Sequence, residues 1–161
     1  MAAGKAFKFG SIILSPSVVF FRSKLSFGFV NIKPVLQGHV LVSPFRVVKR
    51  FADLTEEEVS DLFISTQKIS SVIQEEFNAS SLTISIQDGP DAGQTIEHVH
   101  VHILPRKKGD FENNDDVYTA LAEHDKPGLE KRSNGFARKG RRSEEEMAKE
   151  ASKLASYFDN I

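Results

Sequence analysis

The spacing of hydrophobic residues changes several times along the chain, and each spacing predicts a kind of element. Between Val18 and Ser43, short runs of apolar, β-branched and aromatic residues alternate with turn residues, a pattern typical of antiparallel strands. These runs are Val18–Phe21, Leu25–Val30 and His39–Val42. From Thr55 to Phe77 the apolar residues recur at helical spacing, and Thr55 with Glu58 forms a capping box. We therefore expect one long helix packed on a sheet.

The middle of the chain predicts two more strands on either side of a glycine-rich loop. Ser81–Gln87 alternates apolar and polar residues, and the turn residues Asp88–Gly93 interrupt that pattern. The run His98–Leu104 then alternates again, with histidine at every second position. We expect both runs to be strands of the same sheet.

The last third of the chain predicts helices. A short helix is expected near Asp115–His124, and Ser143 with Glu146 forms a second capping box that opens a C-terminal helix reaching about Phe158. This order of elements indicates an α+β fold, in which an antiparallel sheet carries its helices on one face. The other face is then available for a ligand.

Composition narrows the class of protein. The 161-residue chain is expected to form one domain, residues 1–161, and its formal net charge of −1 gives no general attraction to nucleic acid or membranes. Because it contains no cysteine, neither a disulfide nor a thiolate metal site can form. No apolar run approaches the about 18 residues of a membrane span. We expect a cytoplasmic protein, with the nucleus also open to it, and neither a membrane nor a nucleic-acid partner.

Positive charge is concentrated in Lys126–Arg142, where seven lysines and arginines stand against a single glutamate. Its glycine and serine content favours a flexible, solvated loop. Steering of a polyphosphate, or contact with a nucleic-acid or protein partner, is the alternative for this stretch.

The most informative pattern is the row of His98, His100 and His102. On a strand, residues two apart share a face and lie about 6.7 Å from each other, so all three imidazoles are expected on one face. Imidazole acts near neutral pH as a nucleophile, a proton carrier or a metal ligand. A strand whose polar face merely carries histidines in water is one alternative. A zinc site completed by His39 or Asp88 is another.

The residues also carry a family resemblance. His98–Leu104 matches the histidine triad signature, in which three histidines alternate with apolar residues. The chain further resembles the fragile histidine triad branch of that superfamily in Phe9-Gly10, Pro16–Phe20, Leu25–Phe27, Val30-Asn31, Lys33-Pro34, Gly38–Val42, Gln87–Pro90, Ala92–Thr95, Pro105-Arg106 and Arg142–Met147. The resemblance implies a histidine-triad fold whose sheets join across a homodimer. It also implies hydrolysis of diadenosine triphosphate and related dinucleotides.

The three histidines suit the splitting of a phosphoanhydride. His100 is flanked on both sides and is best placed to attack phosphorus, provided that its other ring nitrogen donates to a backbone acceptor. By resemblance, His100 is the nucleophile and becomes transiently nucleotidylated. His102 is expected to contact the phosphate chain and to favour departure of the leaving group. His98 is expected to support the site, as is His39, which also has a purely structural alternative.

Substrate contacts are expected on both sides of the histidine row. The amide of Gln87 can donate to a phosphoryl oxygen, and Gln94 and Thr95, with the backbone around Gly93, can form an anion cradle. A plain turn is the alternative for that loop. Asn31 suits ribose hydroxyls, as its family counterpart does. The other supporting residue expected is Phe9, which either stacks near the adenine or packs in the core.

A triphosphate is strongly anionic, so we expect Mg²⁺ or Mn²⁺ to bind mainly through substrate phosphates, without a dedicated protein cage. By resemblance, adenosine phosphosulfate and adenosine phosphoramidate are possible further substrates. The alternatives in function are a signalling module that is active when loaded with nucleotide, and another histidine-triad activity, either nucleoside phosphoramidase or nucleotidyl transferase.

Overall fold

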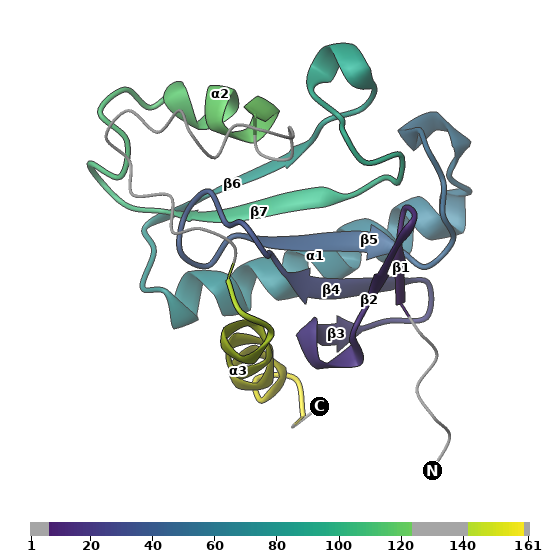
Figure 1. Ribbon diagram of the computed structural model, residues 1–161, viewed down its shortest axis with the longest axis horizontal. Helices are drawn as coiled ribbons and strands as arrows, with labels where there is room; N and C mark the ends of the chain where they lie inside the picture. The colour runs from purple at the N-terminus through teal and green to yellow at the C-terminus, as the bar shows by residue number, and fades with distance from the viewer. Residues whose placement is uncertain (1–6, 124–141, 160–161) are drawn as a thin grey trace.

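A five-stranded antiparallel sheet forms the centre of the molecule (Figure 1). The computed structural model describes residues 7–123 and 142–159. The sheet has the order β3-β4-β5-β7-β6. Its strands are β3 (Val19–Arg22), β4 (Ser26–Val30), β5 (Val40–Pro44), β6 (Ser81–Ile86) and β7 (Val101–Arg106). A separate two-stranded hairpin consists of β1 (Phe7–Phe9) and β2 (Ile12–Leu14). Three short 3₁₀ helices lie between the larger elements: η1 (Pro16–Val18), η2 (Phe51–Asp53) and η3 (Pro90–Ala92). The predicted α+β fold is confirmed.

The helices begin where their capping residues predicted. The long helix α1 (Glu56–Glu76) opens with both hydrogen bonds of the Thr55–Glu58 capping box. Helix α3 (Glu144–Ala155) follows Ser143, whose hydroxyl accepts the Glu146 N–H. Each such N-cap contributes on the order of 1 kcal/mol, so these short polar motifs fix where the helices start.

One face of the sheet packs on α1 and α3 and holds the main core. In Figure 1, α1 runs behind the strands and α3 lies beside β3 and β4. The strands contribute alternating β-branched residues to this core, and the helices contribute larger aliphatic ones: Val40, Val42, Val101, Ile103, Leu62, Ile69, Ile73 and Leu154. A fully buried side chain of this kind is worth about 1.5–3 kcal/mol, so this layer holds the sheet rigid beneath the opposite face.

The opposite face is covered at its two ends, and one of these covers corrects the sequence prediction. Helix α2 (Asp116–Glu123) packs Val117 and Leu121 onto Leu104. Because Ile103 belongs to the core under α1, its neighbour Leu104 points to the other face. The expectation that the helices share one face is therefore wrong for α2. The cause is Leu104, an apolar residue on the histidine face that needs a cover of its own.

The hairpin of β1 and β2, which the sequence analysis did not predict, covers the other end of this face. Phe7 and Phe9 pack on Phe27, Phe29 and Leu41, which point away from α1. In Figure 1 the hairpin lies across β4 and β5. The histidine region is thus left between the hairpin and α2.

None of the helices in residues 7–123 and 142–159 is long and apolar enough to cross a membrane. The predicted flexible loop at 126–142 lies outside the described residues, except for Arg142, its last member.

Candidate active site

The histidine row begins before its strand does. β7 starts at Val101, so His98 and His100 precede the ladder and only His102 lies within it. The predicted strand His98–Leu104 is therefore wrong in its first residues.

The partner strand explains this early irregularity. β5 ends at Pro44, which has no N–H with which to extend the ladder. In place of a further backbone bond, the Ser43 hydroxyl donates to the Val99 carbonyl at 2.7 Å. The backbone before β7 is thereby held by the Ser43 side chain and by a bond from the Val99 N–H to the Val48 carbonyl, and the His98 carbonyl can serve another partner.

The rings nevertheless gather as predicted. His98, His100, His102 and His39 are between 0% and 3% exposed. The ring centroids of His100 and His102 are 4.9 Å apart, and those of His39 and His102 are 5.2 Å apart. The alternative of histidines standing in water is therefore excluded, because all four are buried.

The tautomer of His100 is fixed by the backbone. Its Nδ1 lies 2.6 Å from the His98 carbonyl oxygen, which can only accept a hydrogen bond. Nδ1 therefore carries the hydrogen, and the lone pair of the neutral ring is on Nε2. The expected donation of the other ring nitrogen to a backbone acceptor is confirmed.

A second backbone group sets the tautomer of His102 through His39. The Val35 N–H donates to His39 Nδ1 at 3.0 Å, so the hydrogen of the neutral His39 ring is on Nε2. That Nε2 lies 2.9 Å from His102 Nδ1 and donates to it. The hydrogen of His102 is then on its Nε2. His39 thus connects a loop N–H to a triad histidine.

His98 is held at both nitrogens. The N–H of Gly10 donates to Nδ1 at 3.0 Å, and Nε2 donates to the Pro44 carbonyl at 2.8 Å. Burial is the main cause that lowers the pKa of His98 below its ordinary value, and it outweighs the hydrogen bond to Pro44, which acts to raise the pKa. His98 is therefore a neutral support that ties the β1–β2 turn to the end of β5.

Phe9 packs against the triad from the hairpin. Its ring is buried and contacts Phe29, with His98 at 5.8 Å and His100 at 4.9 Å between ring centroids. The His100 contact is edge-on, with the planes at 88°. Of the two expectations for Phe9, packing in the core describes its observed contacts, while a position near the adenine stays a prediction.

The loop between β6 and the triad is ordered by Gln94. Its Oε1 accepts the Gly89 N–H at 2.8 Å, and its Nε2 donates to the carbonyls of Lys49 and Ile96. Both donors of the amide are used inside the protein. Gln94 therefore shapes the loop that was predicted to be an anion cradle.

An ion pair fixes the same loop from outside. Asp88 accepts from the Arg50 guanidinium at 3.1 Å and from the Phe51 N–H at 2.9 Å. Donation by Arg50 is the leading cause of the lowered pKa of Asp88, so this carboxylate is ionised at neutral pH. Asp88 is consequently committed to the loop.

Gly93 allows the loop to approach Gln87 and α2 closely. Its φ is +94°, and a Cβ there would lie 2.7 Å from Gln87 Nε2 and 3.2 Å from Ala122 Cα. Only glycine meets both demands without strain. The loop thus brings Gly93 close to Gln87, while Thr95 is exposed two residues further along.

Asn31 presents a buried donor on the histidine face. The register that pairs Val30 with Val40 places Asn31 opposite His39. Asn31 Oδ1 accepts the Lys33 N–H at 3.0 Å. Within the described part of the chain, its buried Nδ2 has no hydrogen-bond partner. A buried donor without a partner is costly, so this amide is suited to a ligand oxygen.

Ser85 is a site residue that the sequence analysis missed. It pairs with His102 across β6 and β7 and therefore shares its face. Its hydroxyl is buried and has no hydrogen-bond partner among the residues described. The alternation that places Thr83, Ser85 and Gln87 on one face was the available signal.

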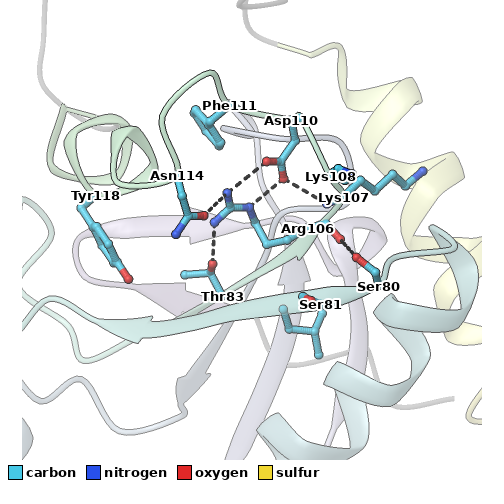
Figure 2. Close-up of a pocket in the computed structure, with 12 residues that line it drawn as sticks. Ser80, Ser81, Thr83, Arg106, Lys107, Lys108, Asp110, Phe111, Asn114 and Tyr118 are labelled. Atoms are coloured by element: carbon cyan, nitrogen blue, oxygen red, sulfur yellow. Dashed lines mark hydrogen bonds and ion pairs between the residues drawn. The ribbon is translucent and has the colours of Figure 1, made fainter.

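A cavity of about 450 Å³ lies at the far end of β6 and β7, away from the histidines (Figure 2). Arg106 donates there to Asp110, Thr83 and Asn114, and these bonds hold the segment that leads into α2. None of the predicted site residues is among its described lining residues. This cavity is therefore distinct from the histidine site.

The histidine site does not fit zinc. Both nitrogens of His98 are engaged with backbone groups, His39 and His102 bond to each other, and Asp88 is paired with Arg50. Across residues 7–123 and 142–159, no group of three His, Asp or Glu side chains is arranged to hold a metal ion.

Four buried imidazoles on one face of the antiparallel sheet of an α+β fold, beside a glycine-rich loop, define a histidine-triad site. The HIT domain family model matches residues 14–109, and the chain belongs to the HIT family. A Dictyostelium discoideum protein named bis(5'-adenosyl)-triphosphatase is 50% identical over 151 residues, which are 94% of this chain and 92% of that protein. The Arabidopsis thaliana protein named bifunctional bis(5'-adenosyl)-triphosphatase/adenylylsulfatase FHIT is 50% identical over 154 residues, 96% of this chain and 85% of its own. The resemblance to the fragile histidine triad branch is confirmed.

A solved structure supports the same relationship. The structure of Plasmodium falciparum diadenosine triphosphate hydrolase with cyclomarin A aligns with a TM-score of 0.77 and 31% identity. The alignment covers 98% of this chain and 87% of that one.

The buried His98 predicts a loss of stability in mild acid. An unfolded imidazole takes up a proton as the pH falls below 6.5, whereas the buried one does so only at a lower pH. The unfolded state then binds more protons than the folded state. The free energy of unfolding therefore decreases as the pH is lowered, by at most about 1.4 kcal/mol per pH unit for this residue. His98→Gln can keep an acceptor for Gly10 and a donor for Pro44 but cannot titrate. Urea unfolding between pH 7 and 5 should therefore give a shallower slope for the variant, and equal slopes would contradict this account.

Proposed function

We propose that this chain hydrolyses dinucleoside polyphosphates, chiefly diadenosine triphosphate to AMP and ADP, through a nucleotidyl intermediate on His100. The observation that carries the proposal is the His100 tautomer, in which the bond from Nδ1 to the His98 carbonyl leaves the lone pair on Nε2. The names of the Dictyostelium and Arabidopsis relatives support the same substrate.

The reaction takes two displacements at one phosphorus. In the first, the lone pair of His100 Nε2 attacks the α-phosphorus and a P–N bond forms. The bond from that phosphorus to the bridging oxygen breaks, and ADP leaves with the oxygen and the electron pair. In the second, water attacks the same phosphorus, the P–N bond breaks, its electrons return to Nε2, and AMP is released as the water gives up a proton.

The His98 carbonyl supports the charge that this attack creates. When Nε2 bonds to phosphorus, the ring becomes cationic and the Nδ1 hydrogen more acidic. The 2.6 Å bond to the carbonyl then strengthens, because hydrogen bonds from ionised donors are the stronger ones. His98 thus acts through its backbone oxygen as well as its ring.

His102 assists the leaving group. With its Nδ1 accepting from His39, the hydrogen on Nε2 is available to the oxygen that departs with ADP. His39 is a positioning residue in this scheme, because it maintains the tautomer that His102 needs.

The other predicted residues divide into contacts and supports. The Gln87 amide, Thr95 and the backbone at Gly93 hold the phosphoryl oxygens, and the buried Asn31 amide donates to a ribose hydroxyl. Gln94 serves the phosphates through the loop that it orders. Phe9 supports the triad by packing.

A divalent cation, Mg²⁺ or Mn²⁺, accompanies the substrate. The described residues offer no cluster of ligands for it, so phosphate oxygens and water would supply its coordination. It would neutralise the charge of the triphosphate. Activity with and without a chelator tests this part of the proposal.

A homodimer is the proposed assembly. β6 is one of the two edge strands of the five-stranded sheet, and Ile84 at its centre is 47% exposed. An open, partly apolar edge strand is suited to pairing with another strand. Sedimentation equilibrium of the purified chain measures this assembly.

The expected location in the cytoplasm and the nucleus is a separate part of the proposal, and imaging of the tagged chain tests it.

Several further functions would use the same site. A covalent AMP on His100 can arise from adenosine phosphosulfate or adenosine phosphoramidate, and the adenylylsulfatase in the Arabidopsis relative's name favours the first. A nucleotidyl transferase would pass the same AMP to another acceptor. As a signalling module, the loaded protein would be the active species. A His100→Asn variant that binds nucleotide but cannot cut it distinguishes the signalling module from the enzyme. If the signalling module is the function, this variant keeps every cellular effect of the wild type.

The nucleophile assignment predicts a transient adduct. Brief mixing with diadenosine triphosphate and magnesium should add the mass of one AMP to the intact wild-type protein, with AMP and ADP as products. His100→Ala should show neither the adduct nor turnover above background, because the substitution removes the Nε2 lone pair that attacks phosphorus. His98→Gln is the matched control and should still form the adduct. Full activity of His100→Ala would overturn the mechanism.

The role of His102 predicts how the rate depends on the leaving group. In a series of AMP phenyl esters, the wild-type rate should depend weakly on the basicity of the phenol, because His102 protonates the departing oxygen. His102→Ala should fall behind by about 10²–10⁴-fold for the most basic phenols and much less for the most acidic. A uniform loss across the series would show that His102 only binds the substrate.

A further inference from the structure

Arg142 is the last residue of the basic stretch, yet it is not part of a solvated loop. Its side chain is 13% exposed. Its Nε donates to the Asn31 carbonyl at 3.1 Å, and its Nη2 donates to the same oxygen. Its Nη1 pairs with Glu150 on α3. A single buried cation therefore joins the start of the C-terminal helix to a residue 111 positions earlier.

The guanidinium of Arg142 remains charged despite its burial. Burial lowers its pKa from the ordinary 12.5, while the negative charge of Glu146 acts in the opposite direction. A buried cation is tolerated only where it is paired and hydrogen-bonded, and here a carboxylate and a carbonyl provide both. Arginine suits this place because its planar fork donates in fixed directions, which a lysine ammonium does not.

The contact fixes a residue whose side-chain Nδ2 has no hydrogen-bond partner among the residues described. The Asn31 carbonyl is held by Arg142, and Asn31 Oδ1 is held by the Lys33 N–H. Its Nδ2 is buried and without a partner in the described part of the chain. Because the Asn31 carbonyl and Oδ1 are both held, the direction of Nδ2 is set before any ligand arrives.

We propose that Arg142 is a positioning residue for ribose recognition, acting through the backbone of Asn31. This inference rests on the proposed function, since it assumes that a nucleotide ribose meets Asn31 Nδ2. The ligand class is a nucleotide with free ribose hydroxyls. Arg142 makes no contact with the sugar in this scheme.

The geometry allows the guanidinium to be tested separately from the backbone. The N–H of Arg142 donates to the Ile32 carbonyl at 3.1 Å, and this bond persists whatever the side chain is. A substitution at Arg142 therefore removes the hold on Asn31 while the two segments stay joined. Lys153 lies on α3, pairs with Glu76 and is not one of the groups that hold Asn31, so Lys153→Met is a matched control.

The experiment measures binding of AMP and of 2',3'-dideoxy-AMP by calorimetry. The wild type should prefer AMP by about 3- to 10-fold, the value of one hydrogen bond. Arg142→Met should lose most of this preference, as Asn31→Ala should, with dideoxy-AMP affinity little changed. Arg142→Lys keeps the charge beside Glu150 but lacks the fork and should be intermediate. Lys153→Met should keep the wild-type ratio.

The outcome is decided by the ratio of the affinity for AMP to the affinity for 2',3'-dideoxy-AMP, and not by either affinity alone. If Arg142→Met binds both ligands more weakly by one factor and keeps its preference, the residue is merely structural and the inference is wrong. If Arg142→Met does not fold, a folded Arg142→Lys with the wild-type ratio overturns it equally. A wild type that forms the His100 adduct but shows no ribose preference contradicts this inference alone. A wild type without adduct or AMP binding contradicts the proposed function as well.

Discussion

A neutral imidazole can donate at only one of its two nitrogens, and the site depends on this constraint. Buried beside one another, the histidines cannot all be charged, so each must place its hydrogen where the chemistry needs it. Backbone groups make that choice. The His98 carbonyl fixes His100, and the Val35 N–H fixes His39 and through it His102. No acidic side chain takes part in these bonds, in contrast to sites where a carboxylate orients the histidine.

The fold places these backbone groups within hydrogen-bonding distance of the histidine rings. Pro44 stops the ladder between β5 and β7, which leaves its own carbonyl to His98. The β1–β2 turn supplies the Gly10 N–H, and Val35, whose N–H donates to His39, packs against the hydrophobic cluster to which α2 contributes. The covers at the two ends of the histidine face therefore do more than bury apolar surface. They hold the turns whose polar groups set the tautomers.

Much of the fold and of the histidine site could be predicted from the sequence, because the features concerned depend on residues close together in the chain. Capping boxes, alternation and the histidine spacing gave the helix starts, the sheet and the row of imidazoles. What could not be predicted depends on contacts between distant segments. The end of the ladder at Pro44 is decided by its partner strand, and the contact of Arg142 with Asn31 links residues 111 positions apart. Composition alone indicated that Arg142 was solvated, since a basic stretch gives no sign of which cation becomes buried.

A site built from neutral imidazoles is suited to a reaction that creates positive charge. A permanent cluster of cations would bind an anionic substrate tightly, but it would stabilise the bound ground state as much as the transition state and add little to the rate. Here the strongest charge develops on His100 only as Nε2 bonds to phosphorus, next to the phosphoryl oxygens and with the His98 carbonyl already 2.6 Å from Nδ1. The attraction between imidazolium and phosphate thus grows along the reaction. The lowered pKa of His98 serves the same end, because a charged ring there would disfavour the cation that His100 must become.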